Sequence, residues 1–324
     1  MNPRFEEPGA KTIKLMQAVT SYFEDLNAAV GAAWNRFWFT ASPASTLGMI
    51  RIAAGLLAFY AVATYYPDLE LWFGDDGMLP LDMVRSLYDG QWSLLDYVPA
   101  HMLWPAYWVA LVVIGLFTLG VGGRITAIAA TVVTFSFFTR APLVTGEFES
   151  ILSFILVYLC IGQADDAYSL KSYWHRHTTN SPLPPPPSPF NTISLRLIQI
   201  HTALACLMMG WAQLAAPESA WWSGEGIFLA AGRPNMPLID LSGLADHPRL
   251  TAAWSHAITL YLLAMPVFIW NRWARPIFVI AGGLVWLSFA LASGWVPFCA
   301  AMLTATAAFV EPPELRPVRE LATA

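Results

Sequence analysis

Eight apolar stretches, each close to the length needed to cross a lipid bilayer, fill most of this chain. A bilayer core of about 30 Å requires about 20 helical residues, and backbone inside lipid must satisfy its own hydrogen bonds, so helices are expected at this spacing. The stretches run Thr46–Tyr66, Leu103–Gly122, Ile125–Phe138, Ile151–Gln163, Ile193–Leu214, Ala252–Ile269, Ile277–Ser293 and Trp295–Val310. The third, fourth and eighth are short, so each of these helices must either extend into the polar residues beside it or pack inside the bundle. We therefore expect an all-α, polytopic membrane helix bundle with about eight transmembrane helices.

The composition supports a membrane class and excludes several others. Of the 324 residues, 56% are apolar and only 12% are charged, against about 25% charged in soluble domains. Nucleic acid is not an expected partner, because the chain has no basic cluster. The cysteines Cys160, Cys206 and Cys299 are far apart within apolar stretches, which favours packing roles over a disulfide framework. No zinc spacing, phosphate loop or nucleophile elbow is present, so no metal site is expected.

The distribution of Lys and Arg predicts the orientation of the helices. Eleven of the 17 basic residues lie in the N-terminal segment, the even-numbered connections and the C-terminal tail. The odd-numbered connections hold four, namely Arg85, Arg140, Arg233 and Arg249. Since cytoplasmic loops carry the excess of basic residues, both termini should be cytoplasmic. Residues 1–12 are polar, so we expect no cleavable signal peptide.

The chain divides into three segments. Residues 1–44 form a cytoplasmic amphipathic segment, in which apolar positions between Ile13 and Trp38 recur every three or four residues; this pattern predicts an interfacial helix along the membrane or against the bundle. Residues 45–311 form the transmembrane bundle, and 312–324 a short cytoplasmic tail. A proline-rich tether at 181–189 separates spans four and five. It is expected to act as a stiff hinge, with docking of a protein partner as the alternative.

Polar and aromatic residues from three spans should meet at the outer side of the bundle. Ionisable residues inside membrane helices are costly and are therefore functional candidates. The candidates are Arg140, Glu147, Glu149, Gln213, Trp221, Trp222, Glu225 and His256. Each also has a structural explanation: the two glutamates can cap a helix, the histidine can pack through a hydrogen bond, and the tryptophans and arginine can anchor at the membrane interface.

A second polar group is expected at the inner side. Arg51 and Arg196, together with Gln199 and His201, could pair with the tail or with the acidic pair Asp165 and Asp166. We interpret this group as mainly structural.

The order of several segments resembles the horizontally transferred transmembrane (HTTM) family, which is related to the membrane domain of vitamin K-dependent gamma-carboxylase. The resemblance covers roughly residues 45–310. It rests on Thr46–Leu57, Trp72–Pro80, Gly146–Phe154, Asp165–Leu170, Leu197–Leu214, Trp221–Ile227 and Gly294–Phe298. Most informative is Met209-Gly-Trp-Ala-Gln-Leu214, which is similar to the end of the family's fifth span, where an apolar-Gly-x-x-Lys pattern precedes a Trp and a Gly-rich turn.

The resemblance carries one departure with a chemical consequence. In the carboxylases, a lysine at the end of the fifth span acts as the base that deprotonates the quinol cofactor. The matching residue here is Gln213, and a carboxamide does not accept a proton near neutral pH. The large extramembrane C-terminal region of the carboxylases is also not matched. Glutamyl carboxylation is therefore not expected, although the resemblance implies an outward-facing pocket for a quinone or other lipid-like molecule and location in a bacterial inner membrane.

Three functional hypotheses follow from these features. The first is a membrane enzyme or enzyme remnant in which Glu147, Glu149 or His256 serves as the base, with the other outer candidates binding the ligand. The second is a non-catalytic membrane partner or scaffold protein, favoured by the loss of the lysine. The third, a transporter, has least support, because no internal repeat and no span broken at its midpoint is evident.

Overall fold

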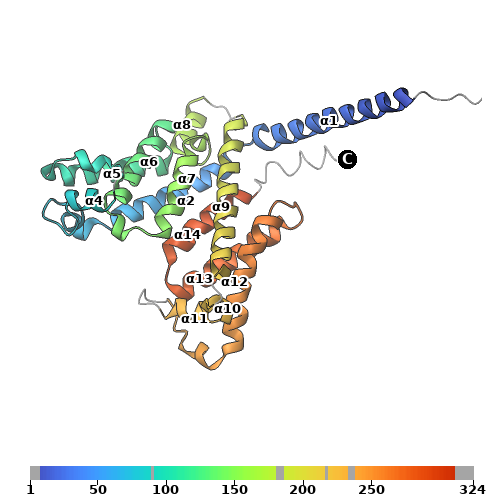
Figure 1. Cartoon of the computed structure of the whole chain (residues 1–324). Helices are drawn as coiled ribbons and strands as arrows, with labels where there is room; N and C mark the ends of the chain where they lie inside the picture. The colour runs from blue at the N-terminus through green and yellow to red at the C-terminus, as the bar shows by residue number, and fades with distance from the viewer. Residues whose placement is uncertain (1–7, 89–90, 180–185, 216–217, 233–237, 311–324) are drawn as a thin grey trace, which may run out of the picture.

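The computed structural model describes residues 8–88, 91–179, 186–215, 218–232 and 238–310 (Figure 1). The regular structure in these residues is helical, apart from one isolated antiparallel bridge between Ser42 and Ser188. A long N-terminal helix, α1 (Pro8–Phe39), precedes the bundle. The all-α class predicted from the sequence is confirmed.

The first half of the bundle contains four main helices that pack in chain order. Helix α2 (Ser45–Ala63) packs on α5 (Leu103–Leu119), α5 on α6 (Gly123–Arg140), and α6 on α7 (Glu147–Leu159). The connection between α2 and α5 is built from short helices. These are η1 (Tyr66–Asp68), α3 (Leu69–Phe73), α4 (Leu81–Leu87), η2 (Leu94–Tyr97) and η3 (Ala100–Met102). After α6 and α7 come η4 (Pro142–Val144), η5 (Ala164–Asp166) and α8 (Leu170–Thr179).

The second half is formed by another set of long helices. Helix α9 (Pro189–Ala215) packs on α12 (Pro248–Phe268), and α13 (Arg275–Ser293) packs on α14 (Val296–Thr306), which continues into η7 (Ala307–Phe309). Three short helices occupy the connection between α9 and α12. They are α10 (Ala220–Ser223), α11 (Gly226–Ala231) and η6 (Ser242–Asp246).

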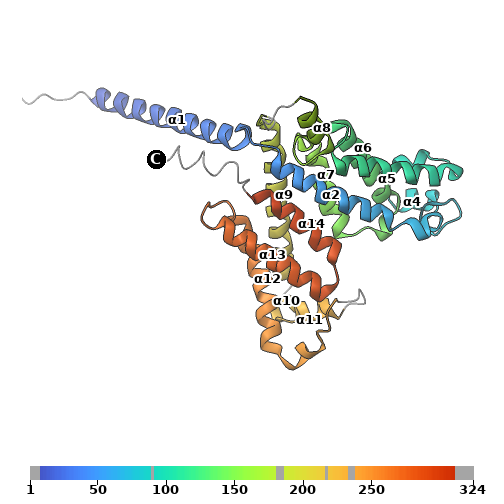
Figure 2. The same ribbon diagram turned by 180° about the vertical axis from the view of Figure 1, so that it is seen from behind.

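The two halves lie at a steep angle to each other. In Figures 1 and 2, α2, α5 and α6 run across the direction of α9 and α12. Helix α14 joins the halves, because it contacts α2 and α7 on one side and α9 and α13 on the other.

Within the part of the chain that the structure describes, five helical segments are long and apolar enough to cross a membrane. They are Ser45–Phe73, Ala100–Leu119, Pro189–Ala215, Pro248–Phe268 and Arg275–Ser293. On α13, Ile277, Ile280, Leu284 and Leu287 are all exposed and form one apolar face. Such a face is unfavourable in water but matches a lipid environment. The helices therefore indicate an integral membrane protein.

The three short stretches also form helices, but these do not meet the length and hydropathy of a membrane span. Helix α7 has 13 residues, which corresponds to about 20 Å, and α14 has 11. Both pack against several neighbouring helices. The number of eight transmembrane helices therefore stays a prediction.

Helix α1 begins and ends close to the predicted amphipathic helix and projects away from the bundle (Figures 1 and 2). Its main contact with the bundle is with α9. The apolar residues along one side are exposed to the surroundings, including Val19, Phe23, Leu26, Val30 and Trp34. Positions 181–185 of the predicted tether and the predicted tail at 312–324 lie outside the described residues.

Candidate functional site

A cavity of about 380 Å³ lies between α9, α12 and α13, at the end of the bundle that carries α10 and α11. Its wall is largely apolar and aromatic. The lining residues that matter here are Glu147, Gln213, Trp221, Ile258, Leu262, Trp286 and Phe289. We call this space the Gln213 cavity. An apolar wall with a few polar groups is typical of a site for a small organic ligand.

Gln213 is held in a fixed orientation on the cavity wall. Its Oε1 accepts a hydrogen bond of 2.7 Å from Thr259 Oγ1 on α12. Its amide nitrogen has no hydrogen-bond partner among the described residues. The side chain can therefore offer an N–H donor to a molecule in the cavity.

Trp286 lines the same wall with its ring and carries a buried donor. The residue is only 2% exposed, and its indole Nε1 has no hydrogen-bond partner in the described part of the chain. A buried N–H without a partner is unfavourable by about 1–3 kcal/mol. This nitrogen has no accessible surface, so the donor that can meet a ligand is the Gln213 amide, which favours molecules that carry a carbonyl or ester oxygen.

The α10–α11 segment covers the cavity and is fixed to α12 by one serine. The buried Ser255 hydroxyl donates to the Gly224 carbonyl (2.9 Å) and accepts from the Ile227 N–H (3.1 Å). Gly224 has φ +86°, and a Cβ there would lie 2.5 Å from the Cβ of Ala252. Both the backbone conformation and the close packing therefore require glycine at this turn. Trp221, three residues before Gly224, lies on the cavity wall.

The structure brings together three of the eight predicted outer residues. Glu147, Gln213 and Trp221 line the Gln213 cavity, although they come from α7, α9 and α10. Glu147 is the ionisable side chain among the lining residues. Whether these residues bind a ligand stays a prediction.

Four other predicted residues do not line the cavity. Glu149 accepts a hydrogen bond of 2.8 Å from the Gly146 N–H, so its carboxylate caps the start of α7. Trp222 is 53% exposed, and Glu225 and His256 are also exposed. His256 lies beside the Gly224 turn and does not reach the cavity wall. The structure therefore favours the structural explanation for Glu149.

Arg140 lies in a different place from the other predicted residues. It is 3% exposed; its Nη1 donates to the Leu79 carbonyl (2.8 Å), and its Nε is 3.9 Å from the Asp96 carboxylate. These contacts hold the connection between α2 and α5 against the end of α6. Arg140 therefore fixes the connection between α2 and α5 from inside the protein. This role differs from both sequence hypotheses, which were ligand binding and anchoring at the membrane interface.

Arg51 fixes the connection between α7 and α8. The guanidinium is 1% exposed, and it donates to the carbonyls of Ala164 (2.6 Å), Ala167 (3.2 Å) and Tyr168 (2.7 Å). The expected carboxylate partners instead bind another residue, because Lys171 Nζ donates to both Asp165 and Asp166. Burial alone would lower the pKa of Lys171, but its hydrogen bonds to these carboxylates raise the pKa above the ordinary value.

Gly120 leaves the space that the Arg51 guanidinium occupies. It ends α5 with φ +71°, and a Cβ on it would lie 2.7 Å from Arg51 Nη1. The glycine is therefore required both by its left-handed conformation and by the arginine.

The remaining inner residues also make structural contacts. Arg196 donates to the Gln199 Oε1 (2.8 Å), and Gln199 Nε2 donates to the Ala308 carbonyl (2.7 Å), which links α9 to η7. The ring of His201 is hydrogen-bonded to Tyr158 at 2.8 Å. These contacts agree with a structural role for the group.

Three residues of the site were not singled out from the sequence. Ser255 and Thr259 are small hydroxyl residues four positions apart on an apolar helix, a spacing that places them on one face. The same spacing is found for hydroxyls that only bond their own helix, so it does not identify a site. Trp286 lies within a continuous apolar stretch and has no sequence signal.

Comparison of the chain with protein-family models, curated proteins and solved structures finds no match. Among the described residues, no group of three or more His, Cys, Asp and Glu side chains could hold a metal ion. The function must therefore be argued from the Gln213 cavity itself.

Proposed function

We propose that this integral membrane protein binds a lipid-like molecule with an acceptor oxygen, such as a quinone, in the Gln213 cavity. The main support is the Gln213 amide, an N–H donor without a partner among the described residues on a largely apolar wall. A quinone ring presents carbonyl oxygens to such donors and apolar surface to the aromatic side chains.

The proposed relationship to the HTTM and gamma-carboxylase-like families rests on the sequence segments given above. It agrees with a cavity at the end of α9, which contains the Gln213 position. Because a carboxamide cannot act as a base near neutral pH, we propose binding without glutamyl carboxylation. If a reaction takes place in the cavity, Glu147 is the best candidate for the base, since it is the ionisable residue among those that line the wall.

Blocking the cavity or removing its donor should reduce the amount of bound ligand. Ala212→Trp places a large ring at an exposed lining position, and Met208→Trp on the same helix is the matched control outside the lining. Gln213→Leu keeps the approximate size of the side chain but removes the N–H donor, and it should weaken quinone binding about fivefold to tenfold. Mass spectrometry of co-purified lipids and titration with a short-chain menaquinone analogue measure both effects.

The stability of Gln213→Leu separates a binding role from simple packing. Without ligand, this variant should be about as stable as the wild type, because the Thr259 hydroxyl keeps its hydrogen bond to the Ser255 carbonyl. Equal ligand affinity of Gln213→Leu, Ala212→Trp and wild type would contradict the proposed function.

We further propose that α1 lies on the cytoplasmic surface of a bacterial inner membrane, with both termini on that side. This orientation rests on the distribution of basic residues and on the exposed apolar side of α1. The projection of α1 from the bundle also suits a scaffold protein that presents this helix to another protein (Figure 1).

Cysteine labelling distinguishes these possibilities. Val30 and Ala28 are both exposed but lie on opposite sides of α1. A membrane-impermeant maleimide should modify Ala28→Cys in inverted vesicles only, while Val30→Cys is protected by lipid. Asp76→Cys, on the connection between α2 and α5, should be modified in intact cells. Modification of Val30→Cys as fast as Ala28→Cys would favour the scaffold function, and modification of Ala28→Cys in intact cells would reverse the orientation.

A further inference from the structure

A second cavity, of about 580 Å³, is bounded by the end of α1, the first part of α9, the start of α13 and η7. Arginines from all three long helices line it, namely Arg36 of α1, Arg196 of α9 and Arg275 of α13. No aspartate or glutamate is among the described residues of its wall. We call this space the basic cavity. Three positive charges around one space repel each other, and a bound anion reduces this repulsion.

The arginines of the basic cavity are held in different ways. The Arg196 guanidinium lies over the Phe37 ring, with Cζ 4.4 Å from the ring centroid. Its Nε donates to the Phe37 carbonyl (3.2 Å), and its Nη1 donates to Gln199 Oε1 (2.8 Å). The ring, the carbonyl and the amide are uncharged, so they fix this guanidinium without neutralising it. The Arg36 side chain is exposed and makes no hydrogen bond or ion pair with a described residue, so it is available to a ligand.

The basic cavity lies at the opposite end of α9 from the Gln213 cavity. In Figure 1, α9 runs from the side where α1 joins the bundle to the side of α10 and α11. Arg196 and Gln213 lie about 26 Å apart along this helix, at about 1.5 Å per residue. This distance is close to the thickness of the hydrocarbon core of a bilayer, which is about 30 Å. The basic cavity is therefore expected at the headgroup level of the leaflet opposite the Gln213 cavity.

The wall of the basic cavity also has an apolar part. Leu195 of α9, Phe309 of η7 and the following Val310 line the same space as the arginines. A free phosphate ion makes no use of such surface, whereas a phospholipid carries acyl chains next to its charged headgroup. Basic pockets between membrane helices are known to bind the headgroups of anionic lipids. The combination of charge and apolar surface therefore favours a lipid over a soluble anion.

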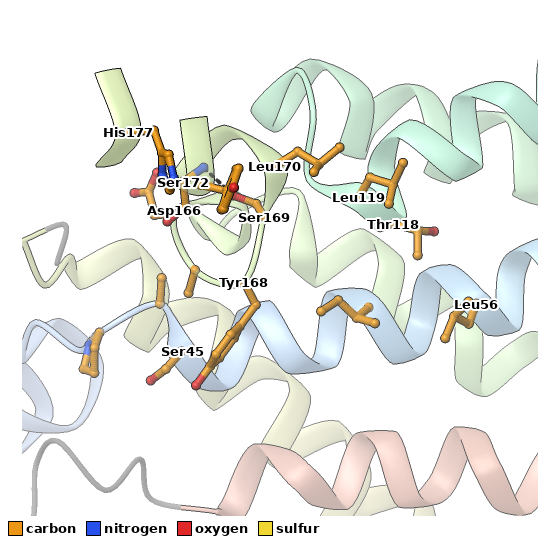
Figure 3. Close-up of a pocket in the computed structure, with 15 residues that line it drawn as sticks. Ser45, Leu56, Thr118, Leu119, Asp166, Tyr168, Ser169, Leu170, Ser172 and His177 are labelled. Atoms are coloured by element: carbon orange, nitrogen blue, oxygen red, sulfur yellow. Dashed lines mark hydrogen bonds between the residues drawn. The ribbon is translucent and has the colours of Figure 1, made fainter. Parts of the chain in front are cut away.

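A larger cavity at the beginning of α2, of about 890 Å³, does not share this charge (Figure 3). Figure 3 shows Asp166 and His177 toward one end of it and Leu56 toward the other. No lysine or arginine is among its described lining residues, and Asp166 is paired with Lys171 at 3.1 Å. This cavity therefore provides a comparison for the basic cavity within the same protein.

We propose that the basic cavity binds one anionic phospholipid, such as phosphatidylglycerol, from the leaflet opposite the Gln213 cavity. The phosphate lies among the side chains of Arg36, Arg196 and Arg275, and an acyl chain lies along Leu195 and Phe309. Because Arg36 belongs to α1, the bound lipid also holds the end of α1 against the bundle. This site is independent of the proposed function of the Gln213 cavity.

Native mass spectrometry of the full chain with added phosphatidylglycerol or phosphatidylethanolamine tests the proposal. The wild type should prefer phosphatidylglycerol. Arg36→Gln should lower the affinity for phosphatidylglycerol about fivefold, which is the effect of one basic residue beside an anionic lipid. Arg272→Gln is the matched control, because Arg272 is also exposed and precedes α13 but lies outside the lining. This variant should bind as the wild type does.

Blocking the space tests the cavity itself. Ala33 is an exposed lining position of α1, so Ala33→Trp should fold and lower the affinity for phosphatidylglycerol about tenfold, because its ring fills the space that the lipid needs. Ala32→Trp, at the exposed neighbouring position outside the lining, is its control. Leu56→Trp, in the larger cavity, should also leave the affinity unchanged. Glycerophosphoglycerol, which has no acyl chains, should bind only weakly.

Several results would overturn the proposal. A loss of affinity in Arg272→Gln as large as that in Arg36→Gln would show a general effect of surface charge instead of a site. Equal affinity of Ala33→Trp and wild type would show that the lipid binds elsewhere. Equal affinity of the wild type for the two lipids, or binding of glycerophosphoglycerol as tight as that of the lipid, would contradict the proposed ligand.

Discussion

Arg51→Leu should destabilise the protein by about 3 kcal/mol or more, because it leaves three backbone carbonyls without their donor and each loss is unfavourable by about 1–3 kcal/mol. The connection between α7 and α8 should then separate from α2. Thermal unfolding of the purified protein in detergent, followed by near-ultraviolet circular dichroism and by the loss of the monodisperse chromatographic peak, measures the effect.

Two control variants show whether the stability depends on the hydrogen bonds of Arg51 or on its charge. Arg51→Lys keeps the charge but cannot reproduce the planar fork that reaches several carbonyls, so its stability should lie between that of wild type and Arg51→Leu. Met49→Leu, at an exposed position of the same helix, should have little effect. Equal thermal stability of Arg51→Leu and wild type would show that the three hydrogen bonds do not hold the connection.

Ser255→Val should release the segment that covers the Gln213 cavity. The change removes one hydroxyl that serves two buried backbone groups, the Gly224 carbonyl and the Ile227 N–H. Leaving both groups unpaired should destabilise this region by about 2 kcal/mol or more. Hydrogen exchange of residues 219–232 should become faster, with smaller changes in α5 and α6.

The matched variant is Ser255→Thr, which keeps the hydroxyl and should retain slow exchange. A valine variant that exchanges as slowly as the wild type would mean that packing alone fixes α10 and α11. Ligand retention should fall together with the faster exchange, since Trp221 belongs to the released segment.

The sequence was sufficient to locate the helices because apolar stretches of membrane length carry a strong signal. Each of the eight stretches corresponds to a helix, from α2 to α14. The sequence determines less well which helices span the membrane, because a short helix such as α7 can be enclosed by neighbouring helices instead of lipid. Apolar composition does not distinguish these two surroundings.

The candidate site was predicted only in part, for reasons visible at particular residues. Membrane depth correctly placed Glu147 and Gln213 at the same end of the bundle, where they line one cavity. Depth does not specify which side of a helix faces inward, so His256 was grouped with them although it is exposed. Glu149 and Arg140 form their hydrogen bonds with backbone groups, which have no sequence signature.

The position of α14 has a consequence for how the protein is made. Its helix contacts α2 and α7, and the Val310 carbonyl that follows it accepts a hydrogen bond from Thr46 at the beginning of α2. About 250 residues separate the two helices in the sequence, which corresponds to about 12–50 s of synthesis at about 5–20 residues per second. During that interval the first half must remain in the membrane with the α14 side of α2, and of α7 once it is made, uncovered. Lipid or an insertion factor has to shield this surface until translation delivers α14.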